Sequence, residues 1–426
     1  MTQLEAALAG DITPQMETVA RAEGLDAEQV REKVASGRAV IPANVHHEAL
    51  VAVGVGEGLR TKVNANFGTS QKYTDADCEI AKLHAAVEAG ADAVMDLSTG
   101  GDIDGVRRQI VEQCTVPLGT VPVYQAAIEA GGPDEMTLGS FMDVLERHAK
   151  DGVDFATIHA GLTREAIPLV EQRLMGAVSR GGSFLIKWMR AHGRESFLYE
   201  NFDEILALCR EHDVTMSLGD GLRPGCIADA TDEAQLHELR VLGELTERCR
   251  EAGVQVMVEG PGHVPLNDVR RNVELQKEIC DGAPFYVLGP LPTDIAPGYD
   301  HVVSAIGGAL AGMSGADFLC YVTPKEHVGL PNADDVREGV VVSKIAAHIA
   351  DVAKGVPGAA DRDRRMAQAR TRRDWDAMKD LCIDPVRFSE MLSTEDRDDK
   401  CSMCGEFCAV KLFREPLEQG ADPADQ

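Results

Sequence analysis

The chain has 426 residues, 44% of them hydrophobic, which allows one large domain or two to three ordinary ones with a substantial core. Its formal net charge of −28 argues against nucleic acid and anionic membranes as partners. No apolar run approaches the roughly 20 residues of a membrane span, and residues 1–16 lack the basic and apolar regions of a signal peptide. We therefore expect a cytoplasmic protein.

Residues 1–40 have a helical pattern, with helix starts at Thr13-Pro14 and at Leu25-Asp26. Short β-branched runs then alternate with amphipathic stretches. Eight runs are apolar nearly throughout, as expected for parallel strands buried on both faces, and they cover 61–67, 92–98, 118–124, 154–159, 214–219, 254–259, 284–289 and 317–322. Most are separated by roughly 30–40 residues, the length of one βα unit. This α/β pattern predicts a (β/α)8 TIM-type barrel, and the alternative is a doubly wound open sheet.

The composition changes after residue 355. A loop and one highly charged helix are expected over 355–381, and the acidic last residues are expected to be disordered. We divide the chain into four parts: an N-terminal helical segment, a barrel domain, a C-terminal helical arm and a tail, covering 1–58, 59–355, 356–412 and 413–426. To take part in chemistry, the arm must fold over a barrel mouth, either its own or that of a neighbouring chain.

Three cysteines of this arm, Cys401, Cys404 and Cys408, have the spacing C-x2-C-x3-C, with no fourth cysteine close by. Three thiolates can hold three irons of a 4Fe–4S cluster and leave the fourth iron open. A radical enzyme needs such an open iron to chelate S-adenosylmethionine. The alternatives are a zinc site that borrows a distant ligand, or three unrelated thiols. The other eight cysteines, Cys78 and Cys320 among them, are expected to be core residues.

All eight predicted strands end in polar residues, on the side where barrel enzymes carry out their chemistry. His263 and His327 follow the sixth and eighth strands, close enough around a barrel mouth to share zinc or Fe(II) with positions left open. The alternative is two unrelated loop histidines. Glu259, near His263, could accept a proton or hold a substrate amine.

Two further segments, 179–182 and 220–223, combine glycines with arginines. Backbone N–H groups and guanidinium groups are what a phosphate needs. The alternative is a pair of tight turns with exposed arginines.

Seven motifs together resemble the phosphomethylpyrimidine synthase family of thiamine biosynthesis: NANFGTS, VMDLSTGGD, DGLRPG, EGPGHVP, LPTDIAPGYDH, TPKEHVGLP and CSMCGEFC. The resemblance covers nearly the whole chain. It implies a radical S-adenosylmethionine enzyme with a (β/α)8 barrel and a C-terminal arm that bears the cluster, acting as a domain-swapped homodimer. Such an enzyme rearranges 5-aminoimidazole ribotide into 4-amino-5-hydroxymethyl-2-methylpyrimidine phosphate and releases formate and carbon monoxide.

The resemblance also implies roles for individual residues. The implied substrate contacts are Asn66, Met95, Tyr124, His159, Ser179, Arg180, Gly181, Asp220, Gly221, Leu222, Arg223, Glu259 and Tyr286. His263 and His327 would hold Zn2+ or Fe2+, and Cys401, Cys404 and Cys408 would hold the 4Fe–4S cluster. Glu259 and the three cysteines would be catalytic. S-adenosyl-L-methionine would be the cosubstrate, and a flavodoxin or ferredoxin would donate electrons.

The chain departs from the longer family members in two ways. Three residues rather than four separate Cys404 from Cys408, which can still close a cluster-binding loop, and a long N-terminal extension is missing. These features indicate a short form. Short forms include 5-hydroxybenzimidazole synthase, which uses the same ribotide in anaerobic cobamide biosynthesis.

Two rival hypotheses lie outside the family. One is a zinc-dependent barrel hydrolase that uses His263, His327 and Glu259, with the cysteine run as a structural metal site. The other is an iron–sulfur or metal-sensing regulator without catalysis. A regulator would leave the polar barrel mouth without an obvious purpose.

Overall fold

The computed structural model describes residues 1–392, 405–410 and 412–413, and the chain divides into two compact units, Met1–Val356 and Pro357–Gln426. The first unit contains a closed barrel of eight parallel strands: β3 (Lys62–Phe67), β4 (Ala93–Asp96), β5 (Leu118–Thr120), β6 (Phe155–Ile158), β7 (Thr215–Leu218), β8 (Val256–Gly260), β9 (Phe285–Leu288) and β10 (Phe318–Cys320). Pairing of Phe318 with Lys62 closes the ring between β10 and β3. The predicted barrel is confirmed, and the open sheet is excluded.

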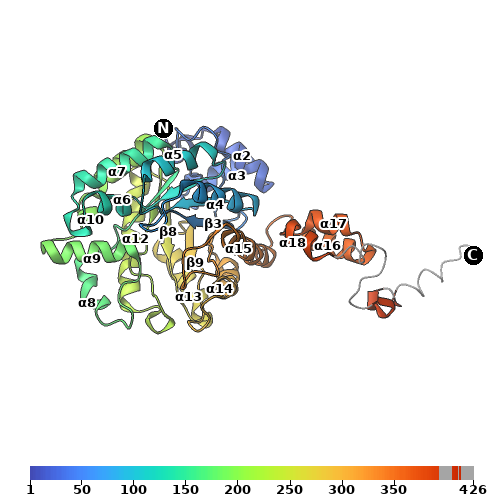
Figure 1. Ribbon diagram of the computed structural model, residues 1–426. Coiled ribbons are helices and arrows are strands. Elements are labelled where there is room, and N and C mark those ends of the chain that lie inside the picture. Colours follow the sequence, from blue (N-terminus) through green and yellow to red (C-terminus); the bar gives the residue numbers. More distant parts are fainter. Residues whose placement is uncertain (393–404, 411, 414–426) are drawn as a thin grey trace, which may run out of the picture. The chain divides into compact units, whose positions relative to one another are not determined.

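Helices surround the strands (Figure 1). The outer layer contains α4 (Ala76–Glu88), α5 (Ile103–Gln113), α6 (Pro122–Glu129), α7 (Leu138–Asp151), α11 (Phe202–His212), α12 (Glu233–Glu251), α13 (Leu266–Ile279), α14 (Asp300–Ser314) and α15 (Ala333–Lys354). The long connection after β6 adds α8 (Ile167–Val170), α9 (Arg180–His192) and α10 (Phe197–Glu200). Among the described helices, none combines the length and the apolarity that crossing a membrane requires.

The third strand is shorter than the sequence pattern predicts. It ends at Thr120, and Pro122 begins helix α6, whereas the expected strand continued to residue 124. Proline has no N–H to donate to the sheet, and its fixed φ suits the first turn of a helix. Tyr124 therefore lies on a helix and not on a strand.

Aspartates that immediately precede three strands fasten the N-terminal end of the barrel. Asp92, Asp154 and Asp317 each accept a backbone N–H from the neighbouring strand segment, from Val63, Leu118 and Phe285, at 2.8 to 2.9 Å. Each also contacts a basic side chain: Lys344 at 2.8 Å, His47 at 2.7 Å and Lys277 at 2.6 Å. These carboxylates tie neighbouring strands together and to the chain around them.

Aromatic rings fill the barrel interior. Phe155 and Phe318 pack edge to face with ring centroids 6.4 Å apart, and Tyr286 lies against Phe318 at 4.4 Å. Gly119 leaves the space for this packing, since a Cβ at that position would lie 2.2 Å from the Phe155 ring. The aromatic layer supports the polar residues at the C-terminal ends of the strands.

The N-terminal residues form α1 (Gln3–Ala9), α2 (Pro14–Glu23) and α3 (Ala27–Ala35). Thr13 caps α2 by accepting the Met16 N–H, and Asp26 is the N-cap of α3, which confirms both predicted helix starts. A short antiparallel pair, β1 (Ala39–Val40) and β2 (Val55–Gly56), follows and was not predicted.

The described part of the second unit contains α16 (Ala359–Arg372), α17 (Trp375–Leu381), α18 (Pro385–Met391) and a short 3-10 turn (Gly405–Phe407). The expectation of one highly charged helix up to residue 381 is wrong. Arg373 has a left-handed backbone conformation that ends α16, and Asp374 caps α17 by accepting the Ala377 N–H. The Arg362 guanidinium donates to the carbonyls of Leu381 and Cys382 and holds α16 against the end of α17.

Candidate active site at the mouth of the barrel

A cavity of about 70 Å3 lies at the C-terminal ends of the barrel strands. Most of the side chains expected to contact substrate line it: Asn66, Met95, Tyr124, His159, Asp220, Arg223, Glu259 and Tyr286. They come from β3, β4, β8, β9 and α6 and from the loops after β6 and β7. The closed sheet thus gathers into one cavity residues that lie far apart in the sequence.

Glu259 is the best-placed proton-transfer group in this cavity. Its Oε1 accepts hydrogen bonds from Thr157 Oγ1 and Ser217 Oγ, both at 2.7 Å. Burial raises the pKa of Glu259 to about 7 and the charge of Asp220 adds to this rise, while the two hydroxyl hydrogen bonds oppose it. A carboxyl group with this pKa can both take and give a proton near neutral pH.

Asp220 and Arg223 form a buried ion pair beside Glu259. Arg223 Nη1 donates to Asp220 Oδ1 at 2.8 Å. Burial raises the pKa of Asp220, and Arg223 opposes that rise. Burial also disfavours the charge of Arg223, but Asp220 and the other acidic groups raise its pKa above the usual value, so the guanidinium stays charged. The pair offers substrate a fixed cation and a fixed hydrogen-bond acceptor.

His159, after β6, faces the first turn of helix α9. Its Nε2 lies 3.3 Å from the Oγ of Ser179, the N-cap residue, which also accepts the Gly182 N–H. Gly181 packs against the imidazole, since a Cβ there would lie 2.3 Å from the ring. Burial and the charge of Arg223 lower the pKa of His159 to about 3. A neutral histidine therefore lies beside a helix N-terminus, a site suited to anions.

Arg180, the first residue of α9, does not line the 70 Å3 cavity but stacks on one of its walls. Its guanidinium carbon lies 4.8 Å from the centre of the Tyr124 ring. Arg180 also lines a second hollow of about 270 Å3, which shares Asn66 and Leu97 with the first. Lys82 and Tyr321 also line this second hollow.

A chain of hydrogen bonds links Asn66, Tyr286, Met95 and Cys320, which also line the first cavity. Asn64 Nδ2 donates to Asn66 Oδ1 and to the Tyr286 hydroxyl, both at 2.6 Å, and that hydroxyl lies 3.5 Å from Met95 Sδ. Asn66 Nδ2 lies 3.0 Å from Cys320 Sγ. These contacts fix the orientation of three expected substrate-contact side chains.

Gly221 and Leu222 do not line the cavity. Leu222 is fully buried in the hydrophobic core, and its N–H donates to Glu238 Oε2 at 2.7 Å. Gly221 packs against Gly182, since a Cβ at Gly182 would lie 2.2 Å from the Gly221 carbonyl oxygen. The two residues support the loop that carries Asp220 and Arg223.

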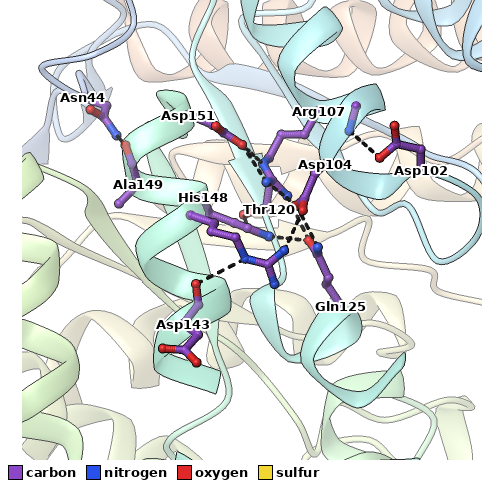
Figure 2. Close-up of polar contacts among 12 residues, drawn as sticks. Asn44, Asp102, Asp104, Arg107, Thr120, Gln125, Asp143, His148, Ala149 and Asp151 are labelled. Atoms are coloured by element: carbon purple, nitrogen blue, oxygen red, sulfur yellow. Dashed lines mark hydrogen bonds and ion pairs between the residues drawn. The ribbon is translucent and has the colours of Figure 1, made fainter. Parts of the chain in front are cut away.

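A buried polar cluster surrounds Gln125, the residue that follows Tyr124 on α6 (Figure 2). Gln125 accepts hydrogen bonds from Arg107 at 2.9 Å and shares a contact of 2.8 Å with His148, while its Nε2 donates to Asp104 at 2.8 Å. Burial holds the pKa of His148 well below its usual value, so the ring is neutral. The cluster anchors helix α6 and with it the cavity wall that Tyr124 forms.

His263 and His327 lie together, with ring centroids 5.5 Å apart. The Nδ1 of His263 contacts Asp294 at 2.7 Å, and the Nδ1 of His327 contacts Asp300 at 2.8 Å. Carboxylates on Nδ1 orient histidines whose Nε2 atoms bind a metal, so the donor set fits a two-histidine centre. No group of three or more His, Cys, Asp or Glu side chains in the described residues is arranged to hold a metal ion.

The three expected cluster cysteines are only partly covered by the structure. Cys401 and Cys404 lie outside the described residues, while Cys408 follows the 3-10 turn and is half-buried. Of the cysteines expected in the core, Cys78 is exposed on α4 and Cys320 borders the active-site cavity. Cys78 occupies a solvent-facing helical position, which an apolar neighbourhood in sequence does not reveal.

Several residues of the site were missed by sequence reasoning. They are Thr157 and Ser217, which hold Glu259, Cys320 in the wall, and Asp294 and Asp300 behind the histidines. Two features of the sequence could have pointed to some of these residues. Thr157 precedes His159 by two residues, and alternate residues of a strand face the same side. Asp294 and Asp300 stand in the motif LPTDIAPGYDH.

Comparison with known proteins agrees with this arrangement of motifs. The model of the radical SAM ThiC family matches residues 2–415. A phosphomethylpyrimidine synthase from Desulforudis audaxviator is 58% identical over 426 residues, covering 98% of each chain, and one from Desulforamulus reducens is 56% identical over 431 residues, covering 99% of each. A dihydropteroate synthase structure from Yersinia pestis matches with a TM-score of 0.42 at 13% identity, over 71% of this chain and 96% of that chain.

The family match extends over the barrel, the polar cavity at its mouth and the cysteine motif alike. The curated relatives share more than half of their residues with this chain over nearly its whole length. The chain therefore belongs to the radical SAM ThiC family of enzymes.

Proposed function

We propose that this enzyme makes the pyrimidine phosphate of thiamine, by converting 5-aminoimidazole ribotide into 4-amino-5-hydroxymethyl-2-methylpyrimidine phosphate with release of formate and carbon monoxide. The observation that carries the proposal is the cavity at the barrel mouth, where Glu259, with a pKa of about 7, adjoins the Asp220–Arg223 pair. The family membership and the name shared by the curated relatives support it.

The ribotide has a phosphate at one end and an aminoimidazole at the other, and the site offers a partner for each. We assign the phosphate to the first turn of α9, where Ser179, Arg180 and Gly181 combine backbone N–H groups with a guanidinium. We assign the amine to Glu259, whose carboxylate form can accept a hydrogen bond from the amine N–H at neutral pH. Binding of the phosphate would supply energy away from the carbons that react.

The proposal includes a 4Fe–4S cluster on Cys401, Cys404 and Cys408, and S-adenosyl-L-methionine in the 270 Å3 hollow beside the substrate cavity. Cluster and cosubstrate, when bound, would supply the 5′-deoxyadenosyl radical chemistry. Asn66 and Leu97 border both hollows, so two ligands bound there would lie side by side. The residues of the chain would align the reacting atoms and exclude water.

We further propose that His263 and His327 hold a zinc or iron(II) ion through their Nε2 atoms, with Asp294 and Asp300 fixing the rings. Such an ion would stabilise negative charge on substrate oxygen or nitrogen at the mouth. The electron donor would be a reduced flavodoxin or ferredoxin. A homodimer would let the cysteine arm of one chain serve either barrel.

The test is an anaerobic incubation of reconstituted protein with 5-aminoimidazole ribotide, S-adenosylmethionine and dithionite, with the products identified by mass spectrometry. We expect the pyrimidine phosphate, formate and 5′-deoxyadenosine. Formation of 5-hydroxybenzimidazole would instead assign the enzyme to cobamide synthesis. If protein with a verified cluster released no 5′-deoxyadenosine, this result would contradict the radical mechanism and favour a zinc hydrolase.

A further inference from the structure

Glu238, on helix α12, is a buried carboxyl group directly behind the substrate cavity, and neither the sequence motifs nor the proposed mechanism uses it. Its residue is 2% exposed. Its Oε2 accepts the Leu222 N–H at 2.7 Å. Its buried Oε1 lies beside Gly221 and makes no hydrogen bond among the described residues, although the Gly221 N–H is near enough to favour the charged form. A buried carboxylate oxygen without a partner is costly if the group is charged.

A further cavity, smaller than the two described above, is lined by Glu238 together with the active-site acids. It measures about 20 Å3, enough for one water molecule, and Glu238, Asp220, Glu259 and Arg223 all line it. Asp220, Arg223 and Glu259 also line the substrate cavity on the other side. The Asp220–Arg223 pair therefore separates two small spaces, with substrate expected on one side and Glu238 on the other.

The charges around Glu238 come from each element packed against it. Asp220 and Arg223 follow β7, Glu259 lies on β8, and Arg173 approaches from the loop after α8, where Asp232 engages it in a salt bridge. Burial and the charge of Asp220 raise the pKa of Glu238 to about 8, and the Leu222 N–H, Arg173 and the Gly221 N–H oppose that rise. Three carboxyl groups thus line one small cavity with Arg223, which already pairs with Asp220.

We propose that Glu238 is a positioning residue that holds a proton at neutral pH, with one oxygen fixing the loop of Asp220–Arg223 and the protonated oxygen facing Asp220 and Glu259 across the water-sized cavity. The bound proton spares the site a third negative charge behind Arg223. When that proton is lost, Glu238 repels Asp220 and Glu259 and competes for Arg223. The Leu222 N–H still binds the ionised carboxylate, and the repulsion instead displaces Asp220 and Glu259 from the positions in which they contact substrate.

This inference rests on the proposed function only in its kinetic part, because the protonation of Glu238 can be measured without cluster or substrate. Glu238→Gln keeps the shape and the acceptor for Leu222 and is neutral at every pH. Glu244→Gln, an exposed position on the same helix, is the matched control. Infrared spectra of the unloaded protein at pH 7 are expected to contain a protonated-carboxyl band that Glu238→Gln lacks and Glu244→Gln retains.

The band is expected to fade in the unmodified chain as the pH rises through about 8. If Glu238→Gln removes no protonated-carboxyl intensity at pH 7, the group is ionised and the inference is wrong. Should the glutamine variant not fold, Glu238→Met keeps the volume, and the same loss of the band is required of it.

The pH profile of kcat/KM with 5-aminoimidazole ribotide separates positioning from mere packing. At pH 9 about a tenth of a group with a pKa of about 8 is still protonated. Relative to its own value at pH 7, Glu238→Gln should therefore retain about tenfold more activity at pH 9 than the unmodified enzyme. Superimposable profiles would overturn the positioning role. If neither the unmodified enzyme nor the variant converts the ribotide, the proposed function fails. The infrared result still decides the protonation of Glu238.

Discussion

The two ends of the barrel handle buried carboxylates in opposite ways. At the N-terminal end, Asp92, Asp154 and Asp317 each receive a backbone N–H and a basic side chain. At the mouth, the carboxyl groups of Asp220 and Glu259 gather around the guanidinium of Arg223. One end uses acid groups to fix the fold, and the other keeps incompletely compensated charge where substrate is expected.

Asp213 is an exception at the N-terminal end. It accepts the Gln3 N–H at 3.0 Å, yet burial raises its pKa to about 7. Burial also raises the pKa of Asp154, although His47 and the N–H groups of Leu118 and Asn44 oppose that rise. The contrast between the two ends therefore lies in the backbone and basic partners of the strand-tying aspartates, and not in the pKa of every buried acid group.

The largest expected effect is on activity at the mouth. Glu259→Gln keeps the acceptor for Thr157 and Ser217 but cannot exchange a proton, so kcat/KM should fall by about 10²–10⁴-fold. The same change removes a buried ionisable group, so the free energy of unfolding at pH 8 should rise by about 1 kcal/mol. Turnover assays and urea unfolding measure the two effects, with exposed Glu244→Gln as the control. A variant that loses both activity and stability would contradict the comparison.

The reverse pattern is expected at the other end. Asp317→Ala leaves the Phe285 N–H and Lys277 without their acceptor, which should cost about 3 kcal/mol of unfolding free energy. Turnover per folded molecule should change little, because Asp317 is remote from the mouth. Urea unfolding with Asp143→Ala, an exposed change on α7, provides the reference. A loss of stability no larger than that of the control would show that the strand ties are dispensable.

Histidine–aspartate pairs sharpen the same contrast. His47 uses both ring nitrogens, on Asp154 at 2.7 Å and on the Cys114 carbonyl at 2.9 Å, whereas the mouth pairs engage Nδ1 with a carboxylate. Asp294→Ala should therefore weaken the proposed metal site about 10–100-fold. Chelator competition with zinc measures this, and an unchanged affinity would argue against a metal on His263.

The pH dependence of stability follows from the raised pKa of Glu259. Its pKa is raised from 4.5 to about 7 in the folded chain, so between these values the folded state holds a proton that the unfolded state has released. The free energy of unfolding should fall as the pH rises through this window, by at most about 1.4 kcal/mol per pH unit for this group. Thermal melts from pH 5 to 7 should show a flatter slope for Glu259→Gln. If the variant and the unmodified chain had the same slope, folding would not raise the pKa of Glu259.

Much of the fold was predictable because the barrel strands are buried on both faces and therefore read as apolar runs. All eight strands lie where these runs predict them, although most are shorter than the runs. The largest error of extent, after Thr120, came from a proline that continues an apolar run into a helix. The helix break at Arg373 was missed because it depends on a left-handed conformation that nothing in the local charge pattern reveals.

The candidate site was predictable where residues stand at strand ends or in motifs, as Glu259 and His263 do. Partners that act from the interior of a strand, such as Thr157, carry no local signal beyond alternation. Glu238 carries less still, because it lies in the middle of a charged helix and only the packing of α12 against the loop after β7 brings it to Leu222. Such supporting residues become visible only in three dimensions.

The most direct test of the central claim is a crystal structure of this chain with 5-aminoimidazole ribotide. We predict the ligand in the mouth cavity, with its phosphate at the first turn of α9 and its amine within hydrogen-bonding distance of Glu259. A ribotide bound elsewhere, or a mouth cavity that stays free of it at saturating concentration, would contradict the account.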